Sequence, residues 1–372
     1  PGYVNPEFAG PAGPIDPDLF VLSIIDATNG SPICVLANYS MHYFGSSAAF
    51  SADYFGEVAG HLEKALRGPN EKSACVAMMS QGTSGDLHWM DYSRPPRPGY
   101  RRQEYSAGLA KKAIDAWQTI EHSAGIELAM AEMRLPLRRR VPSEERLEWA
   151  VKINSERGEE RPSNHAEVYA EQAEWLHENP ETELVLQALR VGDLAITAIP
   201  NEVYAITGLK LKAYSPFPYT MNLELANGAE GYIPPPEQHR LGGYTTWPAR
   251  TAGLEEEAEP KIVESLLSLL SQLAGRPAQI GRVMEYGPYS ALIAKAKPIC
   301  YWQFEEMSGS VVSDSTQKND GLFEDGIALF LPGVQRHAGA ISAPPEQDSP
   351  FVKGRPNHAV HIAGGRVRAE LP

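Results

Sequence analysis

Residues 74–89 read ACVAMMSQGTSGDLHW, and this stretch decides the fold class. Its first half is an apolar run of strand length, and the turn-forming letters GTSGD follow at once, which predicts a buried strand ending in a small-residue loop. Loops at strand ends are where α/β proteins place reactive groups, because the sheet fixes the backbone while the loop exposes the side chain. Asp86 and His88 in this loop are therefore candidate functional residues. For Asp86, a turn aspartate or a helix cap is the alternative.

The segments around this loop alternate between strand and helix patterns, which predicts mixed α/β layers. A charge-rich stretch, 138–180, has a helical pattern and predicts a solvated helical insertion. The turn letters TNGS between two β-rich runs predict a hairpin or two neighbouring strands. Predicted strands cover 19–27, 32–40, 74–81, 126–137, two runs within 184–200, and 219–228, and predicted helices cover 52–67, 101–121, 202–213 and 258–274.

The pattern changes near residue 298. The runs YWQFEE, GLFEDGIALFLPG and AVHIAGG are short and β-like, and Gly, Pro, Asp and Ser separate them, which is typical of an all-β sandwich or jelly roll. We expect a catalytic domain over 1–274, a linker over 275–297 and an incomplete β domain over 298–372.

Composition excludes several classes of protein. The net charge is −14, whereas a nucleic-acid binder needs a basic face. No apolar run approaches the ~20 residues of a membrane-spanning helix, so we expect no transmembrane segment. Three cysteines, Cys34, Cys75 and Cys300, are too few and too scattered for a disulfide framework.

Common catalytic motifs are absent from the chain. It contains no HExxH, no P-loop and no GxGxxG pattern. The letters GTSG at 82–85 are superficially similar to a nucleophile elbow, but they lack the G-x-S-x-G spacing. A serine hydrolase that uses Ser84 is therefore disfavoured.

Other polar residues also lie at the ends of apolar runs. His42 follows one such run in NYSMHYF, Glu202 follows another in AITAIPNEVY, and Tyr232 and Tyr244 frame GYIPPPEQHRLGGY. Each has an ordinary alternative: a hydrogen-bonded histidine, a first-turn helix acid or packing aromatics. Because separate strand ends converge in a folded α/β protein, the four together predict a site.

An ordered series of these segments resembles the neutral/alkaline non-lysosomal ceramidases and their bacterial relatives. The series is GPIDPDLFVLSI, NYSMH, SADYFGEVAGHLE, QGTSGD, IPNEVYAITGLKLKAYSPFPYT and LANGAEGYIPPPEQHRLGGY, and the resemblance covers roughly residues 13–274. It implies a ceramidase-type α/β catalytic domain.

The resemblance also implies one catalytic zinc ion held by two histidines, a glutamate and a tyrosine. His42 matches the second histidine, Glu202 matches the glutamate of a P-G-E turn that reads P-N-E here, and Tyr232 matches the ligand tyrosine. Tyr244 matches a second, catalytic tyrosine. The first histidine would lie upstream of Pro1, so we expect 1–274 to be an N-terminally truncated domain.

Two features depart from that family. Its ceramidases carry G-D-x-S-P-N with a catalytic serine, whereas this chain has GDLHW, with His88 in the place of the serine. His88 could act as a general acid or base, or contact substrate. Asp86 could orient a histidine or pin the turn. In addition, residues 298–372 resemble the start of a laminin-G/concanavalin-like module, a type that often binds glycans or surfaces.

Together these features predict a secreted or periplasmic, Zn²⁺-dependent hydrolase. Its expected substrate is an N-acyl lipid such as ceramide, whose amide bond would be cleaved by metal-activated water. Two alternatives stay open. One is a zinc hydrolase of another amide or ester, and the other is a non-catalytic protein that binds glycans or surfaces.

Overall fold

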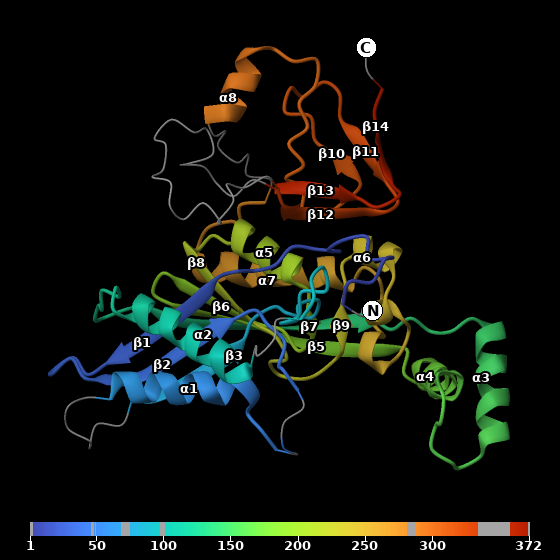
Figure 1. Cartoon of the computed structure of the whole chain (residues 1–372), viewed down its shortest axis with the longest axis horizontal. Coiled ribbons are helices and arrows are strands. Elements are labelled where there is room, and N and C mark those ends of the chain that lie inside the picture. Colours follow the sequence, from blue (N-terminus) through green and yellow to red (C-terminus); the bar gives the residue numbers. More distant parts are fainter. Residues whose placement is uncertain are drawn as a thin grey trace.

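The structure is a computed structural model, and it describes residues 3–45, 48, 50–67, 75–96, 101–280, 288–333 and 358–370. Figure 1 shows a mixed α/β body with a smaller, strand-rich C-terminal part lying over it. The prediction of mixed α/β layers is therefore confirmed.

The first sheet has the order β1-β2-β3. The strands β1 and β2 form the predicted antiparallel hairpin, whereas β2 and β3 run parallel, with α1 between them in the chain. The apolar faces of α1 and α2 pack against this sheet around Tyr54, Val58 and Leu62, which are fully buried. The elements are β1 (Leu19–Ile25), β2 (Pro32–Tyr39), α1 (Asp53–Leu66), β3 (Val76–Gln81) and α2 (Arg102–Trp117).

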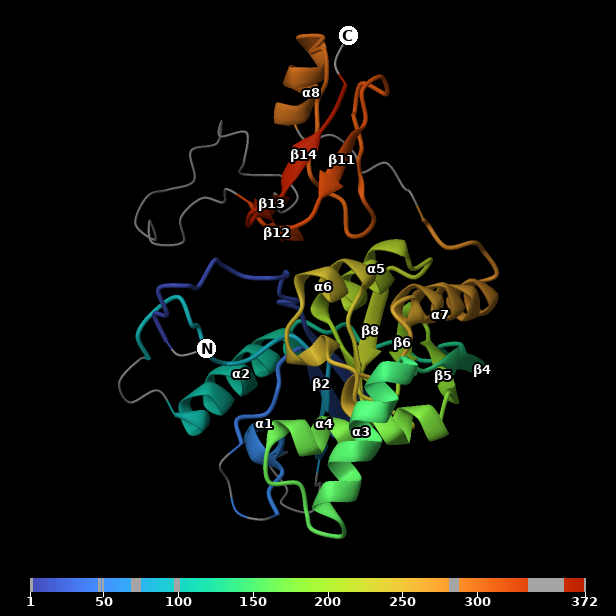
Figure 2. The same ribbon diagram turned by 90° about the vertical axis from the view of Figure 1, so that its right-hand side faces the viewer.

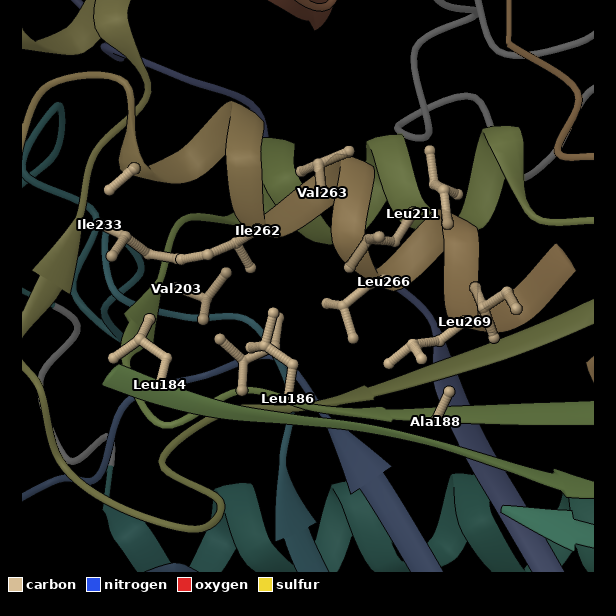
Figure 3. Packing of buried hydrophobic residues seen from close by; sticks show 14 of the residues in the cluster. Leu184, Leu186, Ala188, Val203, Leu211, Ile233, Ile262, Val263, Leu266 and Leu269 are labelled. Atoms are coloured by element: carbon tan, nitrogen blue, oxygen red, sulfur yellow. The ribbon is translucent and has the colours of Figure 1, made fainter. Parts of the chain in front are cut away.

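The second sheet has the order β4-β5-β6-β8, with antiparallel pairs followed by a parallel β6–β8 pair. Its core face packs against α7, where Ile262 and Leu266 meet Leu184 and Leu186 (Figure 3). Each such fully buried side chain contributes roughly 1.5–3 kcal/mol. The elements are β4 (Leu128–Arg138), β5 (Glu181–Val191), β6 (Leu194–Ala198), α5 (Ala205–Tyr214), β8 (Tyr219–Leu223) and α7 (Ala258–Ala274).

The charge-rich stretch forms two helices, as predicted. These are α3 (Glu144–Arg157) and α4 (His165–Glu178), and they pack on each other through small buried alanines. Both begin with a capping side chain, since Ser143 accepts the Arg146 N–H and Asn164 accepts the Glu167 N–H. The pair projects from one end of the body (Figures 1 and 2).

The two sheets meet through polar groups at the carboxyl ends of their strands. The Asn38 side chain donates to the Asn222 carbonyl oxygen at 3.1 Å, and the Glu224 N–H donates to the Gln81 carbonyl oxygen at 3.2 Å. The ends of β2, β3 and β8 are therefore brought to one place, which is what a site built from strand ends requires.

The C-terminal part contains two small sheets, ordered β10-β11-β14 and β12-β13. Leu329 and Phe330 of this part share an apolar cluster with Tyr204 and Ile206 of the body. The elements are α8 (Pro288–Lys295), β10 (Val311–Val312), β11 (Gly321–Glu324), β12 (Ile327–Pro332), β13 (His358–Ile362) and β14 (Arg366–Arg368).

Some segments differ from the predictions. YWQFEE forms a single bridge, Trp302 to Asp314, and no strand, because the Asp314 carboxylate accepts backbone N–H groups, including that of Tyr301, and so folds the chain into a turn. The helix expected from residue 202 begins at Ala205, since Glu202 and Val203 form the short strand β7. Helix α8 lies inside the expected linker.

Candidate functional site

Both candidate histidines lie at one edge of the first sheet. His42 follows β2 and His88 follows β3, and because these strands are parallel neighbours their carboxyl ends lie together. The two imidazole ring centroids are 6.1 Å apart. His42 also lies against the Tyr43 ring at 4.4 Å.

The environment of His88 favours its neutral form. Desolvation by the surrounding protein, and secondarily the neighbouring His42, lowers the pKa of His88 below the ordinary 6.5, although the residue keeps exposed surface. A neutral imidazole can accept a proton and later return it, which is the property that a general acid or base needs at neutral pH.

A second group contains Glu202, Tyr232 and Tyr244. Strand β7 (Glu202–Val203) pairs in parallel with β9 (Tyr232–Ile233), and the register places Glu202 directly opposite Tyr232. The Tyr232 side chain is hydrogen-bonded to that of Glu202, and its hydroxyl lies 3.2 Å from the Tyr244 hydroxyl. All three residues singled out from the sequence here are therefore in contact.

The backbone of Gly231 places Tyr232 in this group. Gly231 has φ +77°, and a Cβ there would come within 2.5 Å of the Thr251 backbone. Only glycine accepts both constraints. Helix α6 (Pro236–Leu241) and the 3₁₀ turn Tyr244–Thr246 then return the chain, so that Tyr244 reaches Tyr232.

The two tyrosines differ in environment. Burial raises the pKa of Tyr232 well above its ordinary value, and the hydrogen bonds to Tyr244 and Glu202 raise it further. Its hydroxyl is therefore protonated. Tyr244 is 63% exposed, so its hydroxyl can meet a substrate from solvent.

Gly85 joins the histidine edge to the second group. Its N–H donates to the Val203 carbonyl oxygen at 2.7 Å, and a Cβ at Gly85 would lie 2.8 Å from the Glu202 carbonyl. Loop 82–88 therefore lies directly against β7, and any larger residue at position 85 would push the two apart.

Glu224 organises this contact, and the sequence reasoning missed it. It is buried, and its carboxylate accepts the Ser84 hydroxyl at 2.6 Å, the Gln81 side-chain amide at 2.7 Å and the Val203 N–H at 2.7 Å. Burial raises the pKa of Glu224 to about 8, although these hydrogen bonds lower it. It directly follows strand β8, which ends at Leu223, whereas the strand predicted over 219–228 placed Glu224 inside the strand, so the strand-end criterion did not select it.

These contacts bear on Ser84. The residue is 1% exposed and donates its hydroxyl to Glu224, so it binds loop 82–88 in place and is closed to a substrate. A nucleophilic serine at this position is thereby disfavoured, as its spacing predicted.

Asp86 serves the adjacent helix. Its carboxylate accepts the Ala205 N–H at 2.8 Å, and Ala205 is the first residue of α5, whose own capping position provides no side-chain acceptor. Asp86 therefore caps α5 from a distance and pins the loop that precedes His88. Crowding by surrounding protein raises the pKa of Asp86 to about 7, although the residue keeps accessible surface.

Solved structures of ceramidases resemble this chain. No profile of a known protein family matches the chain, and no curated protein matches it. Among solved structures, a ceramidase described as complexed with C2 has a TM-score of 0.51 and 18% identity. The neutral ceramidase from Pseudomonas aeruginosa has a TM-score of 0.50 and 18% identity. The chain has the fold of the neutral ceramidases.

The likeness has defined limits. It covers 76% of this chain and 52% of the first structure, and 86% of this chain and 57% of the second. The chain thus spans little more than half the length of these ceramidases. The predicted ceramidase-type fold is confirmed, and the strand-rich C-terminal part agrees with the predicted β segment. In the described part of the chain, no helix is long and apolar enough to cross a membrane.

The ceramidase-like fold raises the question of a metal. Within the described residues, no three His, Cys, Asp or Glu side chains converge at one point. The predicted ligands are instead one imidazole, one carboxylate and one phenol, from His42, Glu202 and Tyr232. Nitrogen and oxygen donors of these kinds suit zinc. The contact between Glu202 and Tyr232 brings two of them together, whereas the ring contacts of His42 in the described part of the chain are with Tyr43 and His88, so the fit is one of donor chemistry and not of a formed three-ligand geometry.

Proposed function

We propose that this protein is a zinc-dependent hydrolase that cleaves the amide bond of an N-acyl lipid such as ceramide. The observation that carries the proposal is the Glu202–Tyr232–Tyr244 cluster, held against the loop of His88 in a ceramidase-like fold. The proposal includes a secreted or periplasmic location, as the family resemblance implies.

In this proposal, His42, Glu202 and Tyr232 would hold the zinc ion. When bound, the ion would supply Lewis-acid polarisation and a more acidic water. Glu202 also accepts a hydrogen bond from Tyr232, and this bond orients the Tyr232 hydroxyl.

Tyr244 and His88 would act on the substrate. The exposed Tyr244 hydroxyl would donate a hydrogen bond to the oxygen that becomes negative when the carbonyl is attacked, and removing such a donor typically costs ~10²–10³ in rate. His88, neutral at pH 7, would take a proton from the attacking water and give one to the leaving amine. Asp86 and Glu224 would hold the loop in position.

The direct test is release of fatty acid from ceramide by the purified protein. We expect turnover by the wild type and its loss in Glu202→Gln. Glu183→Gln is the matched control, because Glu183 lies on β5 and pairs on the surface with Arg134. If Glu183→Gln lost as much activity as Glu202→Gln, or if the wild type released no fatty acid, the proposal would fail.

A second candidate function keeps the fold and the metal but changes the substrate. The presence of His88 at the place of the family serine favours it. A panel of acyl amides, acyl esters and sugar amides separates the two. Ceramide as the best substrate supports the first candidate, and any other member of the panel supports the second.

Glycan contact by residues 298–372 is a separate part of the proposal. It is tested by measuring whether Glu202→Gln, which lacks the proposed metal ligand, still binds glycans.

A further inference from the structure

A cavity lies where the pair α3–α4 meets the loop that follows Tyr244. We propose that this cavity binds a single-chain fatty carboxylate, with the alkyl chain inside and the carboxylate at Arg140 and Arg146. Its volume is about 640 Å³, and its walls include Tyr169, Leu176 and Trp247. Small-molecule sites typically measure roughly 300–1,000 Å³ and have mostly apolar walls.

Packed aromatic rings form part of the apolar wall. The Tyr169 and Trp247 rings meet edge to face with centroids 5.7 Å apart, and Leu176 is 1% exposed. Trp247 nevertheless stays 47% exposed, so it presents an apolar surface that nothing in the described structure covers. An alkyl chain would remove this surface from water.

The charged residues that line the cavity are both basic. Among the described residues, Arg140 and Arg146 line it, and no Asp or Glu does. The chain as a whole carries 47 acidic and 33 basic residues, so a lining without a carboxylate is contrary to its composition. The occupant that complements an apolar cavity bearing two arginines is an amphiphile with an anionic head.

Arg140 retains capacity for such a head group. It donates to the carbonyl oxygens of Leu254 and Ala252, and within the described residues it forms no ion pair. A guanidinium has five N–H donors, so further donors stay available. Burial lowers the pKa of Arg140, and the nearby charge of Glu256 offsets this only in part. A bound carboxylate would supply the missing counter-charge.

The N-termini of two helices also lie at the cavity. Ser143 is the capping residue of α3 and His165 is the first residue of α4, and both line the cavity. The positive ends of two helix dipoles therefore lie at this cavity, although the first turns also carry the acids Glu144, Glu145 and Glu167, which reduce their field. The Arg146 guanidinium lies over the Trp149 ring at 3.9 Å.

The inference goes beyond the proposed hydrolysis and is tested without turnover. Binding of dodecanoate, below the concentration at which it forms micelles, is measured by calorimetry on Glu202→Gln and on wild type. We expect one molecule per chain in both proteins. Failure of ceramide hydrolysis would leave this result unchanged, so the two proposals are distinguishable.

The head group is tested with dodecanol and with arginine variants. We expect dodecanol to bind about 10-fold more weakly, and Arg140→Gln and Arg146→Gln each to weaken dodecanoate by about 10-fold, since hydrogen bonds to charged groups are the strong ones. Arg134→Gln is the matched control, because Arg134 lies on β4 away from the cavity and pairs with Glu183. Its affinity should stay within about 2-fold of wild type.

Defined results would overturn the inference. These are no binding of dodecanoate, equal binding of dodecanol, or an equal loss in Arg134→Gln. Should Arg140→Gln fail to fold because of its carbonyl contacts, Arg146→Gln decides, since Arg146 lies on the exposed side of α3. Trp247→Ala should also weaken dodecanoate, and unchanged affinity in that variant would contradict the position of the alkyl chain.

Discussion

Two buried carboxylates in this protein are stabilised in different ways. Glu224, at the site, accepts only neutral donors, from Gln81, Ser84 and Val203. Glu259, at the α5–α7 contact, lies 2.9 Å from the Lys210 ammonium and also accepts the Thr207 hydroxyl. One buried acid therefore has a cation beside it, and in the described part of the chain the other does not.

The difference lies in the partner that offsets the charge of each buried acid. A lysine partner offsets the charge of Glu259 inside the core. Neutral donors offset the charge of Glu224 only in part, so burial raises its pKa to about 8. The site edge therefore contains an acid with a raised pKa next to the loop of His88, whereas the α5–α7 contact contains the Lys210–Glu259 ion pair.

The largest expected effect on stability comes from removing Lys210, the partner of Glu259. Lys210→Met should lower the free energy of unfolding by about 3–5 kcal/mol, because it leaves Glu259 charged and unpaired in the core. The measurement is urea denaturation at pH 7. Lys111→Met is the control, since Lys111 pairs with Asp115 on the surface and such pairs contribute about 0–1 kcal/mol. Equal losses of stability in the two variants would contradict the claim that Lys210 stabilises the buried charge of Glu259.

In the candidate site, Tyr244→Phe removes one exposed hydroxyl. We expect kcat to fall by ~10²–10³ while stability changes little, because the lost hydrogen bond is one to the reacting oxygen. Steady-state hydrolysis of ceramide measures this. The matched control is Tyr219→Phe, another exposed tyrosine, 61% accessible, at the start of β8. Unchanged kcat in Tyr244→Phe would remove Tyr244 from the mechanism.

Glu224→Gln sharpens the comparison through pH. Between the ordinary pKa of 4.5 and the folded value of about 8, the folded protein holds a proton that the unfolded chain releases. The contribution of Glu224 to stability is therefore fully present below about pH 4.5 and is lost as pH rises toward 8. Glutamine does not titrate, so this loss is absent from the variant.

The expected size follows from linkage. From pH 6.0 to 7.5, the stability of Glu224→Gln relative to wild type should improve by about 2 kcal/mol, at about 1.4 kcal/mol per pH unit. Denaturant unfolding at several pH values measures it. A stability difference that stays constant with pH would show that Glu224 does not hold a proton in the folded state.

Much of the fold follows from periodicity. The hairpin β1–β2, the strand β3 and helices α3, α4 and α7 lie where the apolar patterns predict them, because each buries one face against a neighbour. The short elements do not, since their hydrogen bonds come from tertiary contacts. Strand β7 exists because Glu202 and Val203 pair with β9, thirty positions further along the chain, and no local pattern shows that.

The site follows the same rule. Glu202, Tyr232 and Tyr244 could be singled out because they border strands or an aromatic loop, and they do meet. The helix cap named as the alternative for Asp86 is confirmed, but the helix that it caps could not be predicted, because its partner Ala205 is distant in sequence. The roles of His42 and His88 in metal binding and proton transfer stay predictions.

The most direct test of the central claim is the zinc content of the purified full-length protein, measured by mass spectrometry after exchange into metal-free buffer. The proposed site predicts close to one zinc ion per active site in the wild type, a large loss in Glu202→Gln and in Tyr232→Phe, and no loss in Glu183→Gln. Catalytically active protein without zinc, or zinc retained fully in Glu202→Gln, would contradict the assignment of this cluster as a hydrolytic metal site.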